Sequence, residues 1–117
     1  MAGNETAKIL IIDDDPLSLH ALESLLAGLD LGIVTAASGR QALRHVLSNE
    51  FALILLDINM PELDGIETAA MIRQRRRSYR TPIVFLTADN AEQSYMFKGY
   101  EVGAVDYLVK PVMPEEL

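Results

Sequence analysis

The sequence predicts an α/β fold built on a doubly wound, five-stranded parallel sheet. Five short apolar runs, each of four or five residues and mostly Ile, Leu and Val, alternate with longer amphipathic segments. Runs of this kind are typical of strands that are buried on both faces. Strands that alternate with helices form parallel sheets through right-handed crossovers, which leaves helices on both faces of the sheet. Five strands favour an open sheet over an eight-stranded barrel.

The apolar runs are the expected strands: each is short, and turn residues separate one run from the next. Because each run is bounded by polar or glycine-containing segments, its ends are well marked. In chain order the expected strands are Ile9–Ile12, Ile33–Ala36, Leu53–Leu56, Ile83–Leu86 and Val105–Val109.

Helical periodicity fills the segments between these runs. Pro16 suits a first helical position, and Ser38 is a candidate N-cap of the second helix. The third helix is expected from about Ile66 to Arg76 and the fourth from about Ala91 to Val102. The apolar stripes of the first two helices are Leu19, Leu22, Leu26 and Leu29, then Ala42, Leu43, Val46 and Leu47, and the joints carry Gly28, Gly32, Gly65 and Gly103.

Length and composition indicate one globular domain. The chain has 117 residues, of which 50% are hydrophobic and 23% charged. Its longest apolar run, Phe51 to Leu56, is far shorter than the roughly 18 residues of a membrane span, and residues 1–6 lack the features of a signal peptide. The absence of cysteine excludes disulfides and thiolate metal sites and favours a cytoplasmic location. The net charge of −7 argues against nucleic-acid binding by this domain alone.

One basic cluster opposes the acidic trend, and it lies at the end of the third expected helix. Cations at that position complement the helix dipole, so we expect a solvated helix end, and a patch for a partner is the open alternative. The cluster consists of Arg73, Arg75, Arg76, Arg77 and Arg80.

Polar side chains follow four of the five expected strands. In sheets of this type ligands bind beyond the carboxyl ends of the strands, near the point where the strand order reverses. Strand two ends in small residues with no reactive group. The other four strands deliver carboxylates, a hydroxyl and an ammonium to one edge: Asp13, Asp14 and Asp15, then Asp57, then Thr87, then Lys110.

This set of residues indicates a metal site suited to phosphoryl transfer. Asp13, Asp14 and Asp57 would bring three negative charges together, and their mutual repulsion would destabilise the fold. A divalent cation and the Lys110 ammonium would balance these charges, and oxygen ligands with room for water suit Mg²⁺, with Mn²⁺ as a substitute. A magnesium ion, a lysine and a hydroxyl can hold the oxygens of a phosphoryl group, which a carboxylate can attack.

Four segments of the chain together resemble the receiver domains of two-component response regulators. These segments are ILIIDDDP, LILLDINMPELDGIE, PIVFLTA and GAVDYLVKP, in the order and spacing of that family, and the resemblance extends from Lys8 to the end of the chain. It implies a flavodoxin-like sheet with strand order 2-1-3-4-5. It also implies that a histidine kinase or a histidine phosphotransfer protein is the partner.

The resemblance assigns roles to the metal and acceptor residues. Asp57 resembles the phosphoacceptor, which takes a phosphoryl group from a phosphohistidine. Asp14 resembles the direct metal ligand, and Asp13 resembles the ligand that acts largely through water. Asn59 is expected to offer its backbone carbonyl to the metal. The resemblance implies no enzymatic activity beyond self-phosphorylation and self-dephosphorylation.

The resemblance also assigns residues that respond to phosphorylation. Lys110, followed by a cis peptide bond to Pro111, is expected to pair with a phosphoryl oxygen. Thr87 is expected to bind the phosphoryl group and Tyr107 to turn inward, which would change the surface of helix four and strand five. Asn59 and Asp89 are expected to tune dephosphorylation.

The division of the chain follows from the same resemblance. Residues 1–7 are expected to form an N-terminal tail and residues 8–117 the receiver domain. Family members carry a fifth helix where this chain stops, shortly after Pro114, so we expect a domain truncated at the start of its last helix. Beyond Leu117 the alternatives are an output domain, of a DNA-binding, cyclic-dinucleotide or kinase type, or nothing further. The face of helix four and strand five could support a dimer, and the aromatic residues Tyr95, Phe97 and Tyr100 could belong to a docking surface there or to an apolar stripe.

Several polar residues are expected to be structural. Asp15 suits a cap of the first helix rather than a metal ligand, and Asp64 suits a turn. Asp106 is expected in a surface loop or at a strand end, and His20 and His45 lack metal-like spacing.

Three other functions compete with this interpretation. A phosphohydrolase of the haloacid dehalogenase type needs an acidic residue two positions after the acceptor, where this chain has Asn59. A flavodoxin-like FMN binder needs a phosphate loop after strand one, where three aspartates would repel phosphate. A docking-only receiver without chemistry is disfavoured by the complete set of Asp13, Asp14, Asp57, Thr87 and Lys110.

Overall fold

The computed structural model describes residues 7–75, 78, 80–87 and 106–109, and for residues 87 and 106–109 it describes the backbone. The elements alternate along the chain as the sequence predicts. They are β1 (Lys8–Ile12), α1 (Pro16–Leu26), β2 (Gly32–Ala36), α2 (Gly39–Ser48), β3 (Leu53–Asp57), α3 (Gly65–Arg73), β4 (Ile83–Thr87) and β5 (Asp106–Val109).

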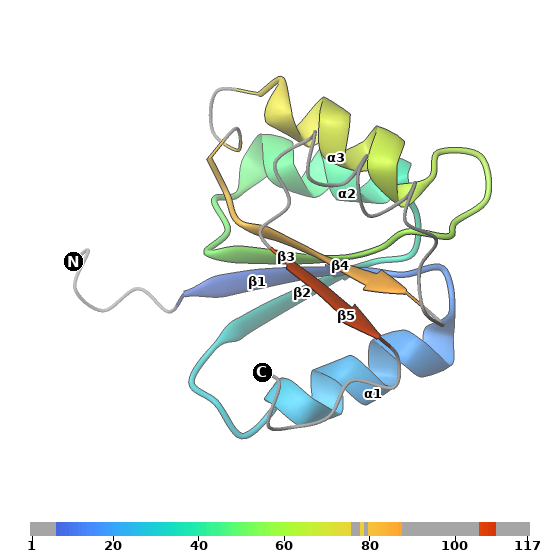
Figure 1. Cartoon of the computed structure of the whole chain (residues 1–117). Helices are drawn as coiled ribbons and strands as arrows, with labels where there is room; N and C mark the ends of the chain where they lie inside the picture. Colours follow the sequence, from blue (N-terminus) through green and yellow to red (C-terminus); the bar gives the residue numbers. More distant parts are fainter. Residues whose placement is uncertain (1–6, 76–77, 79, 88–105, 110–117) are drawn as a thin grey trace.

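The five strands form one parallel sheet in the order β2-β1-β3-β4-β5. Helix α1 lies against one face of the sheet, and α2 and α3 lie side by side against the other (Figure 1). The doubly wound sheet and its strand order are therefore confirmed. The expected fourth and fifth helices, with Tyr95, Phe97 and Tyr100, lie outside the described residues.

Two hydrophobic cores lie on the two faces of the sheet. Successive strand residues point to opposite faces, so β1 sends Leu10 and Ile12 to one core and Ile9 and Ile11 to the other. Helices α2 and α3 complete the first core, and α1 completes the second through Leu22 and Leu26. The central strands are buried on both faces, as the sequence predicts.

Strand β2 departs from that expectation because it is an edge strand. Its residues 32–35 are only partly buried, and Ala36 alone is fully buried. The apolar run of β2 resembles the others in composition, but its place at the edge leaves it with a single neighbour, β1.

The helix starts follow the expected capping pattern. Asp15 and Ser38 are the N-caps of α1 and α2, and Pro16 is the first residue of α1. The prediction for Asp64 was incomplete, because this residue is the N-cap of α3 rather than a simple turn residue. Its side chain accepts from the Glu67 backbone, and the Glu67 side chain accepts from the Asp64 backbone.

Two helix ends differ from the expected ones. Helix α1 ends at Leu26, so Leu29 lies beyond it and is 54% exposed. Helix α3 ends at Arg73, with Gln74 as its C-cap, and not at Arg76.

Among the described residues, no helix is long and apolar enough to cross a membrane.

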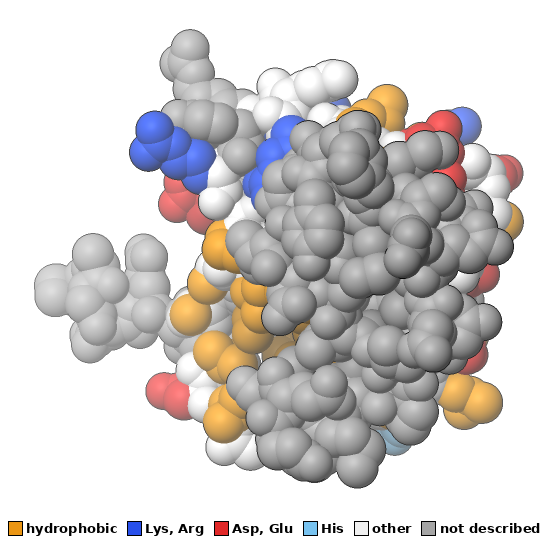
Figure 2. Space-filling view, in the orientation of Figure 1, with side chains coloured by type: hydrophobic (Ala, Val, Ile, Leu, Met, Phe, Trp, Pro, Cys, Tyr) orange, Lys and Arg blue, Asp and Glu red, His pale blue; other side chains and the backbone are white. Residues whose placement is uncertain are grey.

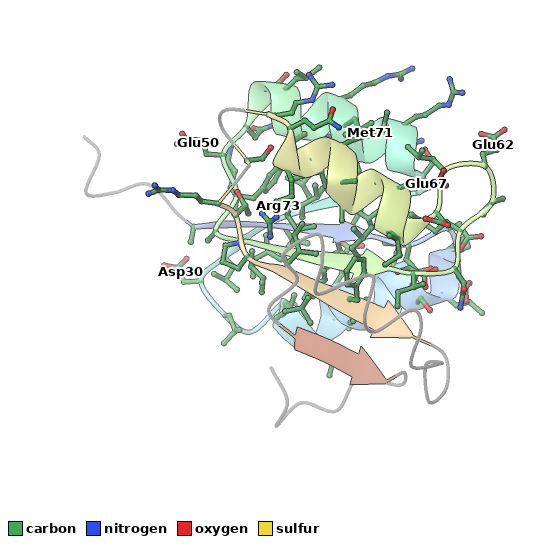
Figure 3. The ribbon with its side chains drawn as sticks, turned by 45° about the horizontal axis from the view of Figure 1, so that its top comes forward. Asp30, Glu50, Glu62, Glu67, Met71 and Arg73 are labelled. Carbon is green, nitrogen blue, oxygen red and sulfur yellow. The ribbon has the colours of Figure 1, made fainter. Side chains whose placement is uncertain are left out.

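The prediction of a solvated helix end is wrong for Arg73. Its guanidinium donates to the backbone oxygens of Ser78 and Thr81, so the side chain reaches from α3 toward the start of β4 (Figure 3). Partial burial lowers the pKa of Arg73, because desolvation disfavours its charged form. Arg80 is exposed, as expected, and basic side chains gather over the loop that follows α3, at the upper left of Figure 2. Arg76 and Arg77 lie outside the described residues.

Candidate functional site

Three aspartates meet at the carboxyl edge of the sheet. Asp13 and Asp14 follow β1, and Asp57 is the last residue of the neighbouring strand β3. A carboxylate oxygen from each lies within 4.8 Å of the others. Asp13 is 0% exposed and Asp57 4%, whereas Asp14 is exposed. Two of the three carboxyl groups are therefore held inside the protein, and the third faces the solvent.

The hydrogen bonds around Asp13 show that the three consecutive aspartates have different structural roles. The Asp13 backbone N–H donates to the Ala36 carbonyl at 3.1 Å, which extends the pairing of β1 with β2 by one residue. The Asp13 carboxylate accepts from the Asp15 backbone at 2.9 Å, and the Asp15 carboxylate accepts from the Leu17 backbone at 3.0 Å. Asp15 thus caps α1, which confirms its expected structural role, and Asp13 and Asp14 are left for the site.

The backbone around Asp57 is fixed from both sides. The Ile58 N–H donates to the Leu86 carbonyl of β4 at 3.0 Å, and the Ile58 carbonyl accepts from the Gly65 N–H at 2.9 Å. The Asp57 carboxylate accepts from the Asn59 N–H at 3.3 Å. Strand β4 and the first residue of α3 therefore hold the peptide that follows Asp57.

The donor chemistry of the cluster fits a hard divalent cation. All three side chains are carboxylates, and oxygen ligands are those that Mg²⁺ and Mn²⁺ prefer. Three like charges within 4.8 Å repel one another, and a divalent cation would relieve that repulsion. The exposed Asp14 leaves the cluster open to water, which suits an ion that keeps part of its hydration shell. The cluster could therefore hold a metal ion.

The remaining predicted site residues are placed less fully. The Asn59 side chain is exposed beside the cluster, two residues after Asp57. Thr87 is the last residue of β4, where its backbone pairs with Val109 of β5, and Tyr107 pairs with Phe85. Strand β4 therefore ends at the same edge as β3. Asp89 and Lys110 lie outside the described residues, and the roles of all these residues stay predictions.

One residue near the cluster has a position that the sequence does not reveal. From the sequence, Gly65 is expected only at a joint between elements. In the structure it is buried, and it packs directly against the backbone of Asp57 and Ile58. The sequence signal that points to it is a glycine directly after the helix cap Asp64, at a position that many other residues could occupy.

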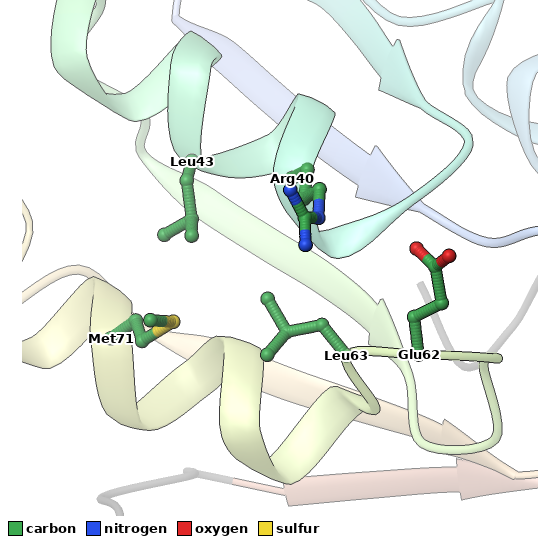
Figure 4. Close-up of a pocket in the computed structure, with 5 residues that line it drawn as sticks. All are labelled: Arg40, Leu43, Glu62, Leu63 and Met71. Atoms are coloured by element: carbon green, nitrogen blue, oxygen red, sulfur yellow. The ribbon is translucent and has the colours of Figure 1, made fainter.

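A groove of about 590 Å³ lies between α2 and α3 (Figure 4). Leu43, Leu63 and Met71 give it an apolar lining, and Arg40 and Glu62 lie at one end. Glu62 has a positive φ of 63°, which marks a tight turn in the loop between β3 and α3. None of the lining residues belongs to the acidic cluster, so the groove is a separate feature.

Together, the fold and the cluster define a class of α/β domain with an acidic, metal-competent site at the carboxyl edge of its sheet. Residues 9–117 match the model of one family, the response regulator receiver domain. The chain belongs to this family, whose members are signalling domains of two-component systems.

Individual relatives agree with this assignment. The transcriptional regulatory protein SrrA of Staphylococcus aureus is 38% identical over 110 residues, which are 94% of this chain and 44% of that protein. The chain thus spans less than half the length of the curated relatives that it matches. The chemotaxis protein CheY4 of Vibrio cholerae has a TM-score of 0.87 at 33% identity, over 95% of this chain and 92% of that one.

A third relative was solved with a metal ion. The receiver domain of the sensor histidine kinase PA1611 of Pseudomonas aeruginosa has a TM-score of 0.85 at 33% identity, over 96% of this chain and 91% of that one. In that protein a magnesium ion is coordinated in the active-site cleft.

Proposed function

We propose that this domain accepts a phosphoryl group on Asp57 in a Mg²⁺-dependent reaction. The observation that carries the proposal is the convergence of Asp13, Asp14 and Asp57 within 4.8 Å at the carboxyl edge of the sheet. A buried carboxylate at the end of a central strand is a nucleophile whose position is fixed before the substrate arrives.

The transfer forms one bond and breaks one. A carboxylate oxygen of Asp57 attacks the phosphorus atom, and the bond from phosphorus to the phosphohistidine nitrogen of the partner breaks. The leaving imidazole takes the electron pair of that bond. The product is an aspartyl phosphate, whose charge Lys110 and the hydroxyl of Thr87 would stabilise through hydrogen bonds.

The metal requirement rests on the donor set of the cluster. Asp13, Asp14 and Asp57 would hold the ion, together with the backbone carbonyl of Asn59. When bound, Mg²⁺ supplies positive charge that offsets the repulsion between the carboxylates and the phosphoryl oxygens. The magnesium ion in the cleft of the PA1611 receiver domain supports Mg²⁺ as the ion here.

The phosphoryl group would then shift a two-state equilibrium. Thr87 would move toward the phosphoryl oxygens, Tyr107 would turn inward, and the surface of the fourth helix and β5 would change. Asn59 and Asp89 would govern how a water molecule reaches the phosphorus atom. Phosphorylation would therefore switch the domain to its active state, and hydrolysis of the aspartyl phosphate would return it to the inactive state.

The partners follow from the family. The phosphodonor would be a histidine kinase or a histidine phosphotransfer protein in the cytoplasm. Because SrrA is a transcriptional regulator more than twice as long as this chain, we propose that the domain controls an output domain after Leu117. The face of the fourth helix and β5 would contact that domain or form a dimer.

The test uses a small phosphodonor in place of the kinase. With Mg²⁺ and acetyl phosphate, the intact mass of the domain is expected to rise by one phosphoryl group that is labile to base. In Asp57→Asn this gain is expected to disappear, because the amide is a poor nucleophile. Asp15→Asn is the matched control, since an asparagine at this position can still cap α1.

Two outcomes would contradict the proposal. If Asp57→Asn is phosphorylated like the parent, the acceptor is another residue. If the parent takes up no phosphoryl group from acetyl phosphate or from any kinase, the domain is a docking module without phosphotransfer chemistry.

A further inference from the structure

Gly65 packs closer to the acceptor backbone than any other amino acid could. A Cβ atom built on Gly65 would lie 2.7 Å from the Ile58 Cα and 3.0 Å from the Asp57 carbonyl carbon, and it would lie closer still to the Asp57 carbonyl oxygen. Distances under 3.0 Å are not found for Cβ atoms in proteins. Any side chain at position 65 therefore forces α3 and the Asp57 peptide apart.

The reason for a glycine at this position is space and not backbone conformation. The φ angle of Gly65 lies outside the left-handed region, so other residues could adopt its backbone geometry. Gly65 is the first residue of α3, where glycine offers no advantage in helix propensity. What a larger residue would lose is the close approach of α3 to Asp57 and Ile58.

The close approach of Gly65 affects the site because the atoms that Gly65 contacts are the backbone atoms of Asp57 and Ile58. The Gly65 N–H binds the Ile58 carbonyl at 2.9 Å, and the reciprocal bonds between Asp64 and Glu67 fix where α3 begins. Strand β3 is held on both sides by β1 and β4, so it cannot move away as a whole. A wedge at Gly65 would therefore act on the end of β3, where the Asp57 carboxylate and the Asn59 backbone lie.

We propose that Gly65 is a positioning residue for the Asp57 carboxylate, an inference that rests on the proposed phosphoacceptor function. Its missing side chain lets the start of α3 brace the peptide after Asp57, and this brace sets the distance of Asp57 from Asp13 and Asp14. A misplacement of about 1 Å can cost a reaction about a hundredfold in rate. A displacement of several tenths of an ångström is therefore enough to impair phosphorylation.

Three glycine-to-alanine variants test the proposal, because the added methyl group meets different atoms at each position. At Gly65 the added methyl meets the Asp57 backbone, and at Gly39, the first residue of α2, it meets the side chains of Thr68 and Leu63. At Gly28 it meets nothing within 4 Å. The measurements are the phosphorylation rate at saturating acetyl phosphate and Mg²⁺, the Mg²⁺ affinity without phosphodonor, and the melting temperature.

Gly65→Ala is expected to lower the saturated phosphorylation rate by roughly tenfold or more and to weaken Mg²⁺ binding. Gly39→Ala is expected to melt at a lower temperature than the parent but to keep its phosphorylation rate below the melting transition. Gly28→Ala is expected to match the parent in all three measurements. A folded Gly65→Ala variant with the rate and Mg²⁺ affinity of the parent would overturn the proposal. Because the parent would still be phosphorylated in that case, the proposed function would stand.

A second pair of variants decides the matter if Gly65→Ala does not fold. Glu67→Ala removes half of the reciprocal bond that fixes the start of α3, whereas Glu67→Gln keeps that bond and removes the charge. In Glu67→Ala we expect the phosphorylation rate to fall about threefold, because part of the free energy of the lost cap would appear as a higher activation barrier. In Glu67→Gln we expect the rate of the parent. Equal rates in the parent and both variants would show that the start of α3 does not position Asp57.

Discussion

The two ends of the β3–α3 unit use polar side chains in different ways. At the carboxyl edge of the sheet, the buried Asp13 and Asp57 meet a third carboxylate within 4.8 Å. At the other edge, Ser78 donates to the Ile72 carbonyl at 2.7 Å, and Arg73 donates to the carbonyls of Ser78 and Thr81. Hydrogen bonds are present at both ends, but the first arrangement also brings three carboxylates together, whereas the second joins side-chain donors to backbone carbonyls.

This difference separates the part of the molecule that could hold a metal ion from the part that stabilises the fold. Polar groups that satisfy backbone carbonyls at a helix end contribute to the free energy of unfolding. Crowded carboxylates reduce the free energy of unfolding, and a bound cation would offset that loss. We expect substitutions at the two ends to change different measurements: stability at the α3 end and chemistry at the carboxyl edge.

The largest effect on stability is expected for Arg73→Ala. The change removes a charged donor from the Ser78 and Thr81 carbonyls and should lower the free energy of unfolding by about 2 kcal/mol. Urea denaturation measures the loss, and Arg44→Ala, which removes an exposed arginine from α2, should change it by less than about 0.5 kcal/mol. The folded variant should keep the phosphorylation rate of the parent. A lower phosphorylation rate would contradict the separation of the two ends, because it would show that the α3 end also affects the chemistry at the carboxyl edge.

An intermediate effect is expected on the lifetime of the phosphorylated state. Asn59 is exposed beside the cluster, and we propose that it and Asp89 admit and orient the water that hydrolyses the aspartyl phosphate. The double variant Asn59→Met, Asp89→Arg should slow the decay about tenfold, which corresponds to about 1.4 kcal/mol of activation free energy. The decay is followed by mass spectrometry after removal of the donor. Decay at the parental rate would mean that neither side chain controls the water.

The sequence predicts the sheet and the cluster well because both depend on local patterns. Apolar runs mark the strands, and the residues that follow them must converge where parallel strands end. Asp15, Pro16 and Ser38 could be assigned because capping depends on residues within one turn. These features need no knowledge of how distant parts of the chain pack.

The features that the sequence does not predict depend on packing between distant segments. Arg73 lies in a basic stretch and was expected in solvent, but its partners are carbonyls in the loop before β4. Gly65 could serve any joint, and its contact with Asp57 becomes visible only when α3 is docked on the sheet. The apolar run of β2 gives no sign that the strand lies at the edge.

The smallest expected effect tests the central claim most directly. The claim is that the three carboxylates at the carboxyl edge lower the stability of the domain without metal and bind a cation that restores it. Asp14→Ala removes one of the three crowded carboxylates and should raise the melting temperature in EDTA by roughly 2–5 °C. With increasing Mg²⁺ the melting temperature of the parent should rise and overtake that of the variant, which should respond little. Asp30→Ala, which removes an exposed carboxylate outside the cluster, is the control for the change in net charge. An Asp14→Ala variant that melts below the parent in EDTA, or one that gains as much from Mg²⁺ as the parent does, would contradict the account.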